Sequence, residues 1–302
     1  MRDGPSRSDG LAGWVVVAGI AVVLFATAWL VAARGDDAAE MASFPSVETI
    51  VYGEAPSEFG RLHLPDGLRG GSDPVPVVVL LHGGFWRRTG GDLSLMEPLA
   101  RDLADRGVAV WNVEYGRTGE RFGGWPHTLN HVGAAVDHLA ELAVRVPMDL
   151  DEVTLVGHSA GGHLALWAAG REDFASRSAW VAEVDRPAPA VSVQRVVALA
   201  PIADLSAAAA DGLGNDAVVD LLDGTPSDLP VRYAIAGPQP SATVEVLVVT
   251  GELDDTVPAA FSQVSGAGAS VRSVEVPEED HLRLIAPESA AWAVVLEWLD
   301  LS

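Results

Sequence analysis

The sequence of 302 residues contains no cysteine and no lysine, so all 19 of its Lys+Arg residues are arginine. The lack of cysteine excludes disulfides, thiol nucleophiles and Cys-ligated metal sites. The lack of lysine excludes a P-loop lysine, a Schiff-base lysine and a Ser–Lys dyad. If the chain uses a serine nucleophile, its general base must therefore be a histidine, and the chain has 8 of them.

Positive charge is also scarce. The 42 acidic residues give a formal net charge of −23, and such a surface repels nucleic acid and anionic lipid headgroups. We therefore expect no nucleic-acid partner. The acidity itself serves solubility and does not specify a substrate.

The longest stretch without a charged residue lies near the N-terminus. Residues 11–33 form an uncharged run of 23 residues, and about 20 apolar residues are enough to cross a bilayer. Trp14 and Trp29 stand near its ends, where aromatic rings favour the membrane interface. Arginines in the preceding tail, residues 1–10, favour a cytoplasmic N-terminus. We expect a single-pass membrane protein whose catalytic domain is extracytoplasmic.

A cleaved signal peptide is the alternative interpretation of this segment. Val31-Ala32-Ala33 resembles a small-residue cleavage site, and cleavage would give a secreted protein. The apolar run exceeds the usual length of a signal peptide's core, which favours an uncleaved transmembrane anchor. Residues 34–46 are acidic, small and unpatterned, which predicts a linker. The folded domain is expected over residues 47–302.

The sequence around Ser159 has the pattern of a nucleophile elbow. Residues 153–156 form a short apolar run that predicts a buried strand, and residues 164–168 show helical spacing. Between them lies Gly-His-Ser-Ala-Gly, residues 157–161. A strand that enters a helix through G-x-S-x-G lifts a serine hydroxyl out of the sheet. With 31 glycines the pattern also arises by chance, but its flanking elements favour Ser159 as the nucleophile.

Strands alternate with amphipathic helices through residues 47–302, which predicts one doubly wound α/β domain with a mostly parallel sheet. Its most apolar run, residues 75–81, is typical of a central strand buried on both faces. The run ends in His-Gly-Gly-Phe-Trp, residues 82–86.

This glycine-rich loop is a candidate oxyanion hole. In hydrolases with a nucleophile elbow, a loop after an early strand supplies one amide donor and the residue after the nucleophile supplies another. We assign the donors to Gly84 or Phe85 and to Ala160. The alternative is a simple glycine turn with packed aromatic residues. His82 is expected to brace the loop.

In an α/β fold with a nucleophile elbow, the partners of the serine follow it in the chain as Asp or Glu and then His, so chain order selects the partners of Ser159. Only His281 lies after residue 163, in a loop behind a predicted strand. The preceding strand ends in a turn that offers Asp254 and Asp255, besides Glu252. We predict Asp254 as the acid, with Asp255 as the alternative. The other interpretation is that both residues only form an acidic turn before a helix and have no catalytic role.

Three further histidines follow the helical pattern that begins near residue 127. His127 and His131 have the i, i+4 spacing of some metal ligands, but no acidic residue completes a set. We therefore expect no metal and interpret both, together with His138, as solvated helix residues. Tyr115 and Trp125 either line a substrate pocket or simply pack.

Residues 205–243 are less regular and contain one helix-like piece, residues 216–222. An insert between late strands often caps a pocket.

The motifs together resemble the α/β-hydrolase superfamily over residues 75–300, and more closely its kynurenine-formamidase-like and small carboxylesterase-like branch. They are HGGFW, EYG, GGWP, GHSAGGHLALW, DDTVP and a late DH, in this order. The resemblance implies an α/β-hydrolase fold with Ser159, Asp254 and His281 as the triad and an oxyanion hole near Gly84, Phe85 and Ala160. Tyr115-Gly116 and the predicted membrane segment depart from that branch.

We expect a membrane-anchored serine hydrolase that cleaves a carboxylic ester or an activated amide without a metal or organic cofactor. One alternative is a prolyl-oligopeptidase-type exopeptidase, although no propeller repeat is visible. The other is a non-catalytic, membrane-tethered interaction protein on the same scaffold. The oligomeric state stays open.

Overall fold

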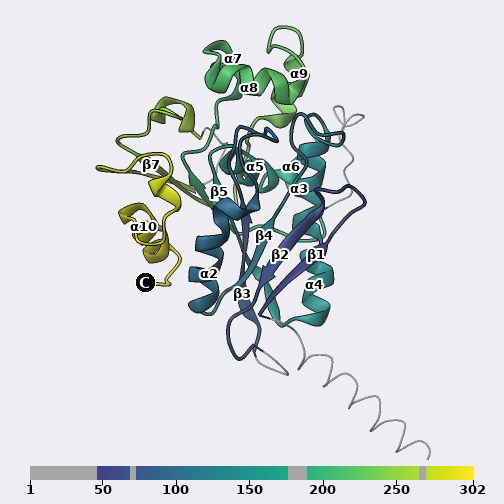
Figure 1. Cartoon of the computed structure of the whole chain (residues 1–302), viewed down its shortest axis with the longest axis vertical. Helices are drawn as coiled ribbons and strands as arrows, with labels where there is room; N and C mark the ends of the chain where they lie inside the picture. The colour runs from purple at the N-terminus through teal and green to yellow at the C-terminus, as the bar shows by residue number, and fades with distance from the viewer. Residues whose placement is uncertain (1–45, 69–72, 176–188, 265–269) are drawn as a thin grey trace, which may run out of the picture. The chain divides into compact units, whose positions relative to one another are not determined.

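One sheet of eight strands organises the domain, in the order β1-β2-β4-β3-β5-β6-β7-β8 (Figure 1). The computed structural model describes residues 46–68, 73–175, 189–264 and 270–302. The strands are β1 (Val47–Val51), β2 (Phe59–His63), β3 (Val75–Leu81), β4 (Ala109–Val113), β5 (Met148–His158), β6 (Arg195–Leu199), β7 (Glu245–Gly251) and β8 (Ser270–Val276).

The sheet is mostly parallel. β2 pairs antiparallel with both β1 and β4, and all pairs from β4 to β8 are parallel. β3 lies between β4 and β5, so the chain reverses its direction of winding there. Ligands of such open sheets bind where the carboxyl ends of the strands meet. This confirms the predicted α/β class with a mostly parallel sheet.

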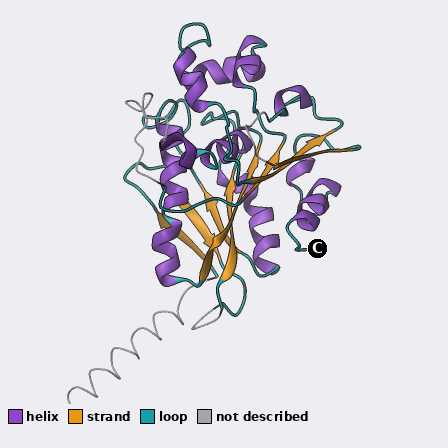
Figure 2. Cartoon of the chain, turned by 180° about the vertical axis from the view of Figure 1, so that it is seen from behind, coloured by secondary structure: helices purple, strands orange, loops and turns teal. Residues whose placement is uncertain are grey.

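Helices cover both faces of the sheet (Figure 2). The helices and helical turns are η1 (Leu93–Met96), α2 (Glu97–Asp105), α3 (His127–Asp137), α4 (Leu139–Arg145), α5 (Ala160–Ala168), α6 (Arg171–Ala175), α7 (Leu205–Ala210), α8 (Leu213–Leu222), α9 (Pro230–Ala236), η2 (Ala259–Ser262), η3 (Arg283–Ile285) and α10 (Ala290–Trp298). The helical segment over residues 93–105 consists of η1 followed directly by α2. Pro98 stands in the first turn of α2, where its missing N–H costs no hydrogen bond.

The main core lies between the sheet and the pair α2 and α10. Val78 and Leu80 of β3 pack there with Leu99 of α2 and Trp292 of α10, and all four are at most 3% exposed. Fully burying an aliphatic side chain of this size contributes about 1.5–3 kcal/mol. The alternating residues of β3 face the opposite layer, which α3, α4 and α5 form. This two-sided burial explains why β3 is nearly continuously apolar.

The segment between β6 and β7 leaves the sheet at its carboxyl end. It holds α7, α8 and α9, which Figure 1 shows together beyond that end. The helix predicted over residues 216–222 is the second part of α8. Three left-handed residues, Gly214, Asn215 and Asp216, form a turn inside that element. We call residues 205–236 the cap.

The two outer strands carry charged side chains on open edges. Glu48 lies on β1, and the exposed Arg272 and Glu275 lie on β8. At the N-terminal side, residues 1–10, the predicted anchor 11–33 and nearly all of the predicted linker lie outside the described residues. Within the described ranges no helix is both long and apolar enough to span a bilayer.

Candidate active site

Ser159 occupies a strained turn between β5 and α5. Its backbone has φ 56° and ψ −119°, a conformation that few non-glycine residues adopt. The turn is tight enough to require glycine on both sides: a Cβ on Gly157 would lie 2.1 Å from the carbonyl oxygen of Gly161, and one on Gly161 would lie 2.1 Å from that of Leu81. Ser159 therefore has the backbone of a nucleophile elbow, and it is 2% exposed.

Asp254 and His281 are brought together from the ends of β7 and β8. The Nδ1 atom of His281 lies 2.6 Å from Oδ2 of Asp254. The other carboxylate oxygen, Oδ1, accepts the amides of Thr256 at 3.0 Å and Val257 at 2.8 Å. Burial raises the pKa of Asp254, but the hydrogen bonds from His281 and from the two amides outweigh it and hold this pKa below its ordinary value. An ionised carboxylate thus fixes the imidazole through Nδ1. Asp255 is exposed.

His281 reaches the elbow through the residue that precedes Ser159. The Nε2 atom of His158 lies 3.0 Å from the carbonyl oxygen of His281. The two imidazole rings lie 4.4 Å apart between centroids and are inclined by 47°. The three residues predicted as the triad follow β5, β7 and β8, so all three lie at the carboxyl ends of parallel strands on one side of the sheet.

The loop after β3 lies against the elbow. A Cβ on Gly83 would lie 3.1 Å from the Cβ of Ser159. Gly84, Phe85 and Trp86 follow with φ of 116°, 53° and 54°, which turns three successive peptide units out of regular structure. Within the described part of the chain, the amides of Gly84, Phe85 and Ala160 donate no hydrogen bond to the protein. Backbone amides without an acceptor are the kind of donor that an oxyanion hole uses.

A buried network supports this loop from below. The ring of His82 lies 2.7 Å from the carbonyl oxygen of Gly83 through Nδ1 and 3.0 Å from Oε1 of Glu114 through Nε2. Tyr115 stacks on that ring at 4.2 Å and donates its hydroxyl to the carbonyl oxygen of His82 at 2.6 Å. His82 therefore braces the loop, as predicted, and Tyr115 packs beneath the loop instead of lining a pocket.

Glu114 is the part of this network that the sequence analysis missed. Burial raises the pKa of its carboxyl, but the hydrogen bond with His82 and the nearby Arg117 outweigh burial and keep it below its ordinary value. The strand register explains the contact between His82 and Glu114. β3 and β4 pair in parallel with Leu81 opposite Val113, which places the next residues, His82 and Glu114, side by side.

The prediction of solvated histidines is wrong for His138, whose side chain is 12% exposed and lies near the rings of Tyr52 and Trp111, and for His131. Its ring is buried, and Nδ1 accepts the amide of Gly116 at 3.0 Å. His131 thus holds the start of the loop behind β4, whereas His127 is exposed. The reason is that α3 packs its His131 side toward this loop, which helical spacing alone does not reveal. Among the described residues, no group of three or more His, Cys, Asp or Glu side chains is placed to hold a metal ion.

Arg87 connects the cap to the loop after β3, which carries the candidate oxyanion donors. Its guanidinium donates to the carbonyl oxygens of Gly214 and Asn215, both at 2.5 Å, and forms an ion pair with Asp220 at 2.6 Å. The ring of Phe85 lies so close to Gly214 that a Cβ there would meet Cδ1 at 2.5 Å. The left-handed turn of the cap is thus seated on the loop that carries the candidate oxyanion donors.

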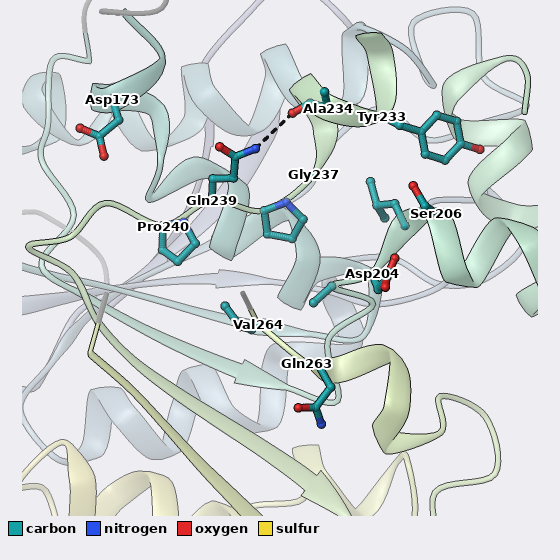
Figure 3. A pocket seen from close by; sticks show the side chains of 13 residues that line it. Asp173, Asp204, Ser206, Tyr233, Ala234, Gly237, Gln239, Pro240, Gln263 and Val264 are labelled. Atoms are coloured by element: carbon teal, nitrogen blue, oxygen red, sulfur yellow. Dashed lines mark hydrogen bonds between the residues drawn. The ribbon is translucent and has the colours of Figure 1, made fainter. Parts of the chain in front are cut away.

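A cavity of about 450 Å³ lies beside the cap (Figure 3). Its walls come from α6, the start of α7, the end of α9 with the following loop, and the residues after η2. Tyr233 and Gln239 line it, and Figure 3 shows the side-chain amide of Gln239 bonded to the carbonyl oxygen of Ala234. None of Ser159, Asp254 and His281 lines this cavity.

A comparison with protein families identifies the chain. The BD-FAE family model matches residues 63–265, about two thirds of the sequence. The chain belongs to the BD-FAE family. BD-FAE domains are α/β-hydrolase-type esterases, so the chain is an enzyme of the serine ester hydrolase type. No curated protein gave a significant match.

Solved esterases share the fold of this BD-FAE chain. The bifunctional GH43-CE protein of Bacteroides eggerthii has a TM-score of 0.65 and 21% identity; the match covers 85% of this chain but only 38% of that longer one. A truncated carbohydrate esterase from gut microbiota has a TM-score of 0.66 and 17% identity, with coverage of 86% and 96%. Esterase B from Lactobacillus rhamnosis has a TM-score of 0.64 and 21% identity, with coverage of 94% and 95%.

Proposed function

We propose that the chain hydrolyses a carboxylic ester through Ser159, His281 and Asp254. His281 takes the hydroxyl proton of Ser159 while Oγ attacks the ester carbonyl, and the protonated ring then gives that proton to the leaving alkoxide. Water, deprotonated by the same ring, attacks the acyl-enzyme and releases the acid. Asp254 keeps His281 in the required tautomer and stabilises the imidazolium.

The observation that carries this proposal is the 2.6 Å hydrogen bond between His281 and the buried carboxylate of Asp254, formed beside a strained Ser159. If Asp254 only formed an acidic turn before a helix, it would not need a histidine as its hydrogen-bond partner. The unbonded amides of Gly84 or Phe85 and of Ala160 are the proposed donors to the tetrahedral oxyanion.

The proposed substrates are esters of short acids with a small alcohol or a carbohydrate. The support comes from the printed names of similar structures, which include a carbohydrate esterase and Esterase B inhibited by a tributyrin phosphonate. An activated amide stays a second substrate class for the same site. A panel of p-nitrophenyl acetate, butyrate and octanoate, tributyrin, acetylated xylan and an aryl amide separates these classes.

Labelling of the full-length chain with a fluorescent fluorophosphonate tests the nucleophile. We expect wild type to label and both Ser159→Ala and His281→Ala to lose labelling together with ester hydrolysis. A folded wild type that never labels would contradict the triad and favour a non-catalytic role of the scaffold. Labelling with no ester turnover but with release of N-terminal dipeptides would instead favour the exopeptidase alternative.

We also propose that residues 11–33 anchor the domain to a membrane, with residues 34–46 as the linker and the catalytic domain outside the cytoplasm. The uncharged run of 23 residues and its flanking arginines support this topology. The enzyme should stay in the membrane fraction after alkaline extraction and be degraded by protease added outside the cell. A soluble mature form that begins near residue 34 would instead favour a cleaved signal peptide.

A further inference from the structure

His158, the residue before Ser159, is buried and joins two parts of the site. It ends β5 and is 2% exposed. Its Nε2 atom lies 3.0 Å from the carbonyl oxygen of His281, and its ring lies 4.4 Å from the ring of His281. In the described part of the chain, this is the one hydrogen bond that the carbonyl oxygen of His281 accepts. The backbone of His281 is therefore fixed by a side chain of the elbow.

The hydrogen bond also defines the tautomer of His158. A carbonyl oxygen only accepts, so Nε2 carries the proton and Nδ1 is bare when the ring is neutral. Burial, together with the neighbouring His281, lowers the pKa of His158 to about 3. The ring thus stays neutral while His281 becomes charged during turnover. A second cation at this distance would oppose that protonation.

The third side of the ring faces the oxyanion loop. A Cβ on Gly83 would lie only 2.8 Å from Nδ1 of His158, so the loop packs directly on the ring. Nδ1 has no hydrogen-bond partner among the described residues. One side chain therefore contacts the nucleophile's own turn, the loop of the base and the loop of the candidate oxyanion donors.

We propose that His158 is a positioning residue that holds the backbone of His281, and thereby its imidazole, in register with Ser159. The proposal rests on the triad proposed above. Asp254 fixes the imidazole at Nδ1 only, which leaves the ring free to pivot about that bond. The hydrogen bond at the carbonyl oxygen supplies a second point of attachment, on the backbone of the same residue.

The structure offers a matched control. His163 is also buried, its Nε2 bonds a backbone carbonyl oxygen at 2.8 Å, and its Nδ1 has no partner among the described residues. Its acceptor is Ala236 of the cap, not a residue of the proposed triad. Replacing either histidine removes a similar buried ring, and only the His158 variant releases His281.

The test compares full-length His158→Leu, His158→Gln and His163→Leu in fluorophosphonate labelling and in hydrolysis of p-nitrophenyl acetate. For His158→Leu we expect the labelling rate and kcat to fall about 10- to 100-fold, because small misplacements of a catalytic group have effects of this size. KM should stay within about threefold, since substrate contacts are kept. The glutamine amide can reach the same carbonyl oxygen, so His158→Gln should recover most of the rate.

His163→Leu should keep kcat near the wild-type value despite a similar loss of thermal stability, and its expected effect is a raised KM, because the lost hydrogen bond holds Ala236 of the cap. Equal rates in His158→Leu and His163→Leu would overturn the proposal, as would a folded His158→Gln that is as slow as His158→Leu. If His158→Leu does not fold, His158→Asn replaces it: asparagine is too short to reach, and a rate equal to that of His158→Gln would overturn the proposal. A wild type that does not label contradicts the triad itself, which distinguishes the two failures.

Discussion

The carboxylate of Asp254 divides its two oxygens between the imidazole of His281 and the amides of Thr256 and Val257. The turn after β7 thus orients the carboxylate, and the carboxylate orients the imidazole. Each oxygen has its own donors, so the position of the acid is fixed by the backbone and not by the histidine alone.

Asp254→Asn should lower kcat about 10³- to 10⁴-fold, because an amide nitrogen in place of Oδ2 favours the wrong tautomer of His281. Asp255→Asn is the matched control: this side chain is exposed, one residue away, and of the same type. Steady-state kinetics on p-nitrophenyl acetate measure the difference. Equal losses in both variants would remove Asp254 from its proposed role.

Arg87→Met should loosen the cap. The change removes the hydrogen bonds to Gly214 and Asn215 and the ion pair with Asp220, which together stabilise the seated cap by about 1–3 kcal/mol. We expect faster amide hydrogen exchange in α8 and a raised KM. Arg88→Met is the control, because Arg88 is exposed and its side chain has no partner in the described part of the chain. Unchanged exchange in Arg87→Met would show that other contacts hold the cap.

Stability should fall in mild acid. Burial lowers the pKa of His158 to about 3 and that of His163 to about 4, from an ordinary value of 6.5. Below pH 6.5 each of these two rings binds a proton in the unfolded chain that it does not bind in the native state. Each ring therefore removes about 1.4 kcal/mol per pH unit as the pH falls from 6.5 toward 5, and neither affects stability above 6.5.

Urea unfolding at several pH values in this range measures the slope. His163→Gln should reduce this slope by about one proton's worth. An identical slope in wild type and His163→Gln would argue that His163 is charged in the native state.

Gly161→Ala should prevent folding or destabilise the domain by several kcal/mol, because its Cβ would collide with backbone atoms, the carbonyl oxygens of Leu81 and His82, at 2.1 and 2.4 Å. Gly133→Ala is the comparison. There the Cβ meets only the guanidinium end of Arg171 at 3.3 Å, and alanine favours the helix α3 by about 1 kcal/mol. Thermal unfolding should separate the two variants clearly.

The sequence predicted the parts of the site that local pattern and chain order determine. G-x-S-x-G required a strand, a turn and a helix, and the order of partners left His281 as the one histidine available. It could not show pairwise contacts across the sheet, such as His82 with Glu114 or His158 with His281. Those contacts depend on strand order and register. The same succession of strands and helices along the chain is compatible with several strand orders and registers, so the pattern does not determine these contacts.

The error on His131 has a related cause. Helical spacing identifies which residues share a face but not which neighbour that face meets. The loop behind β4 returns over α3 and supplies the amide of Gly116 to the imidazole. A polar residue on a helix surface thus becomes buried through a partner that is irregular in structure, and such partners leave no periodic signal.

The charged side chains on the outer strands of the sheet also affect how the domain behaves at high protein concentration. A bare strand edge can recruit the strand of a neighbouring molecule and begin ordered aggregation. Here the exposed Arg272 and Glu275 of β8 would have to bury or oppose their charges in any such pairing. We therefore expect the β8 edge to resist pairing with a second molecule at high protein concentration.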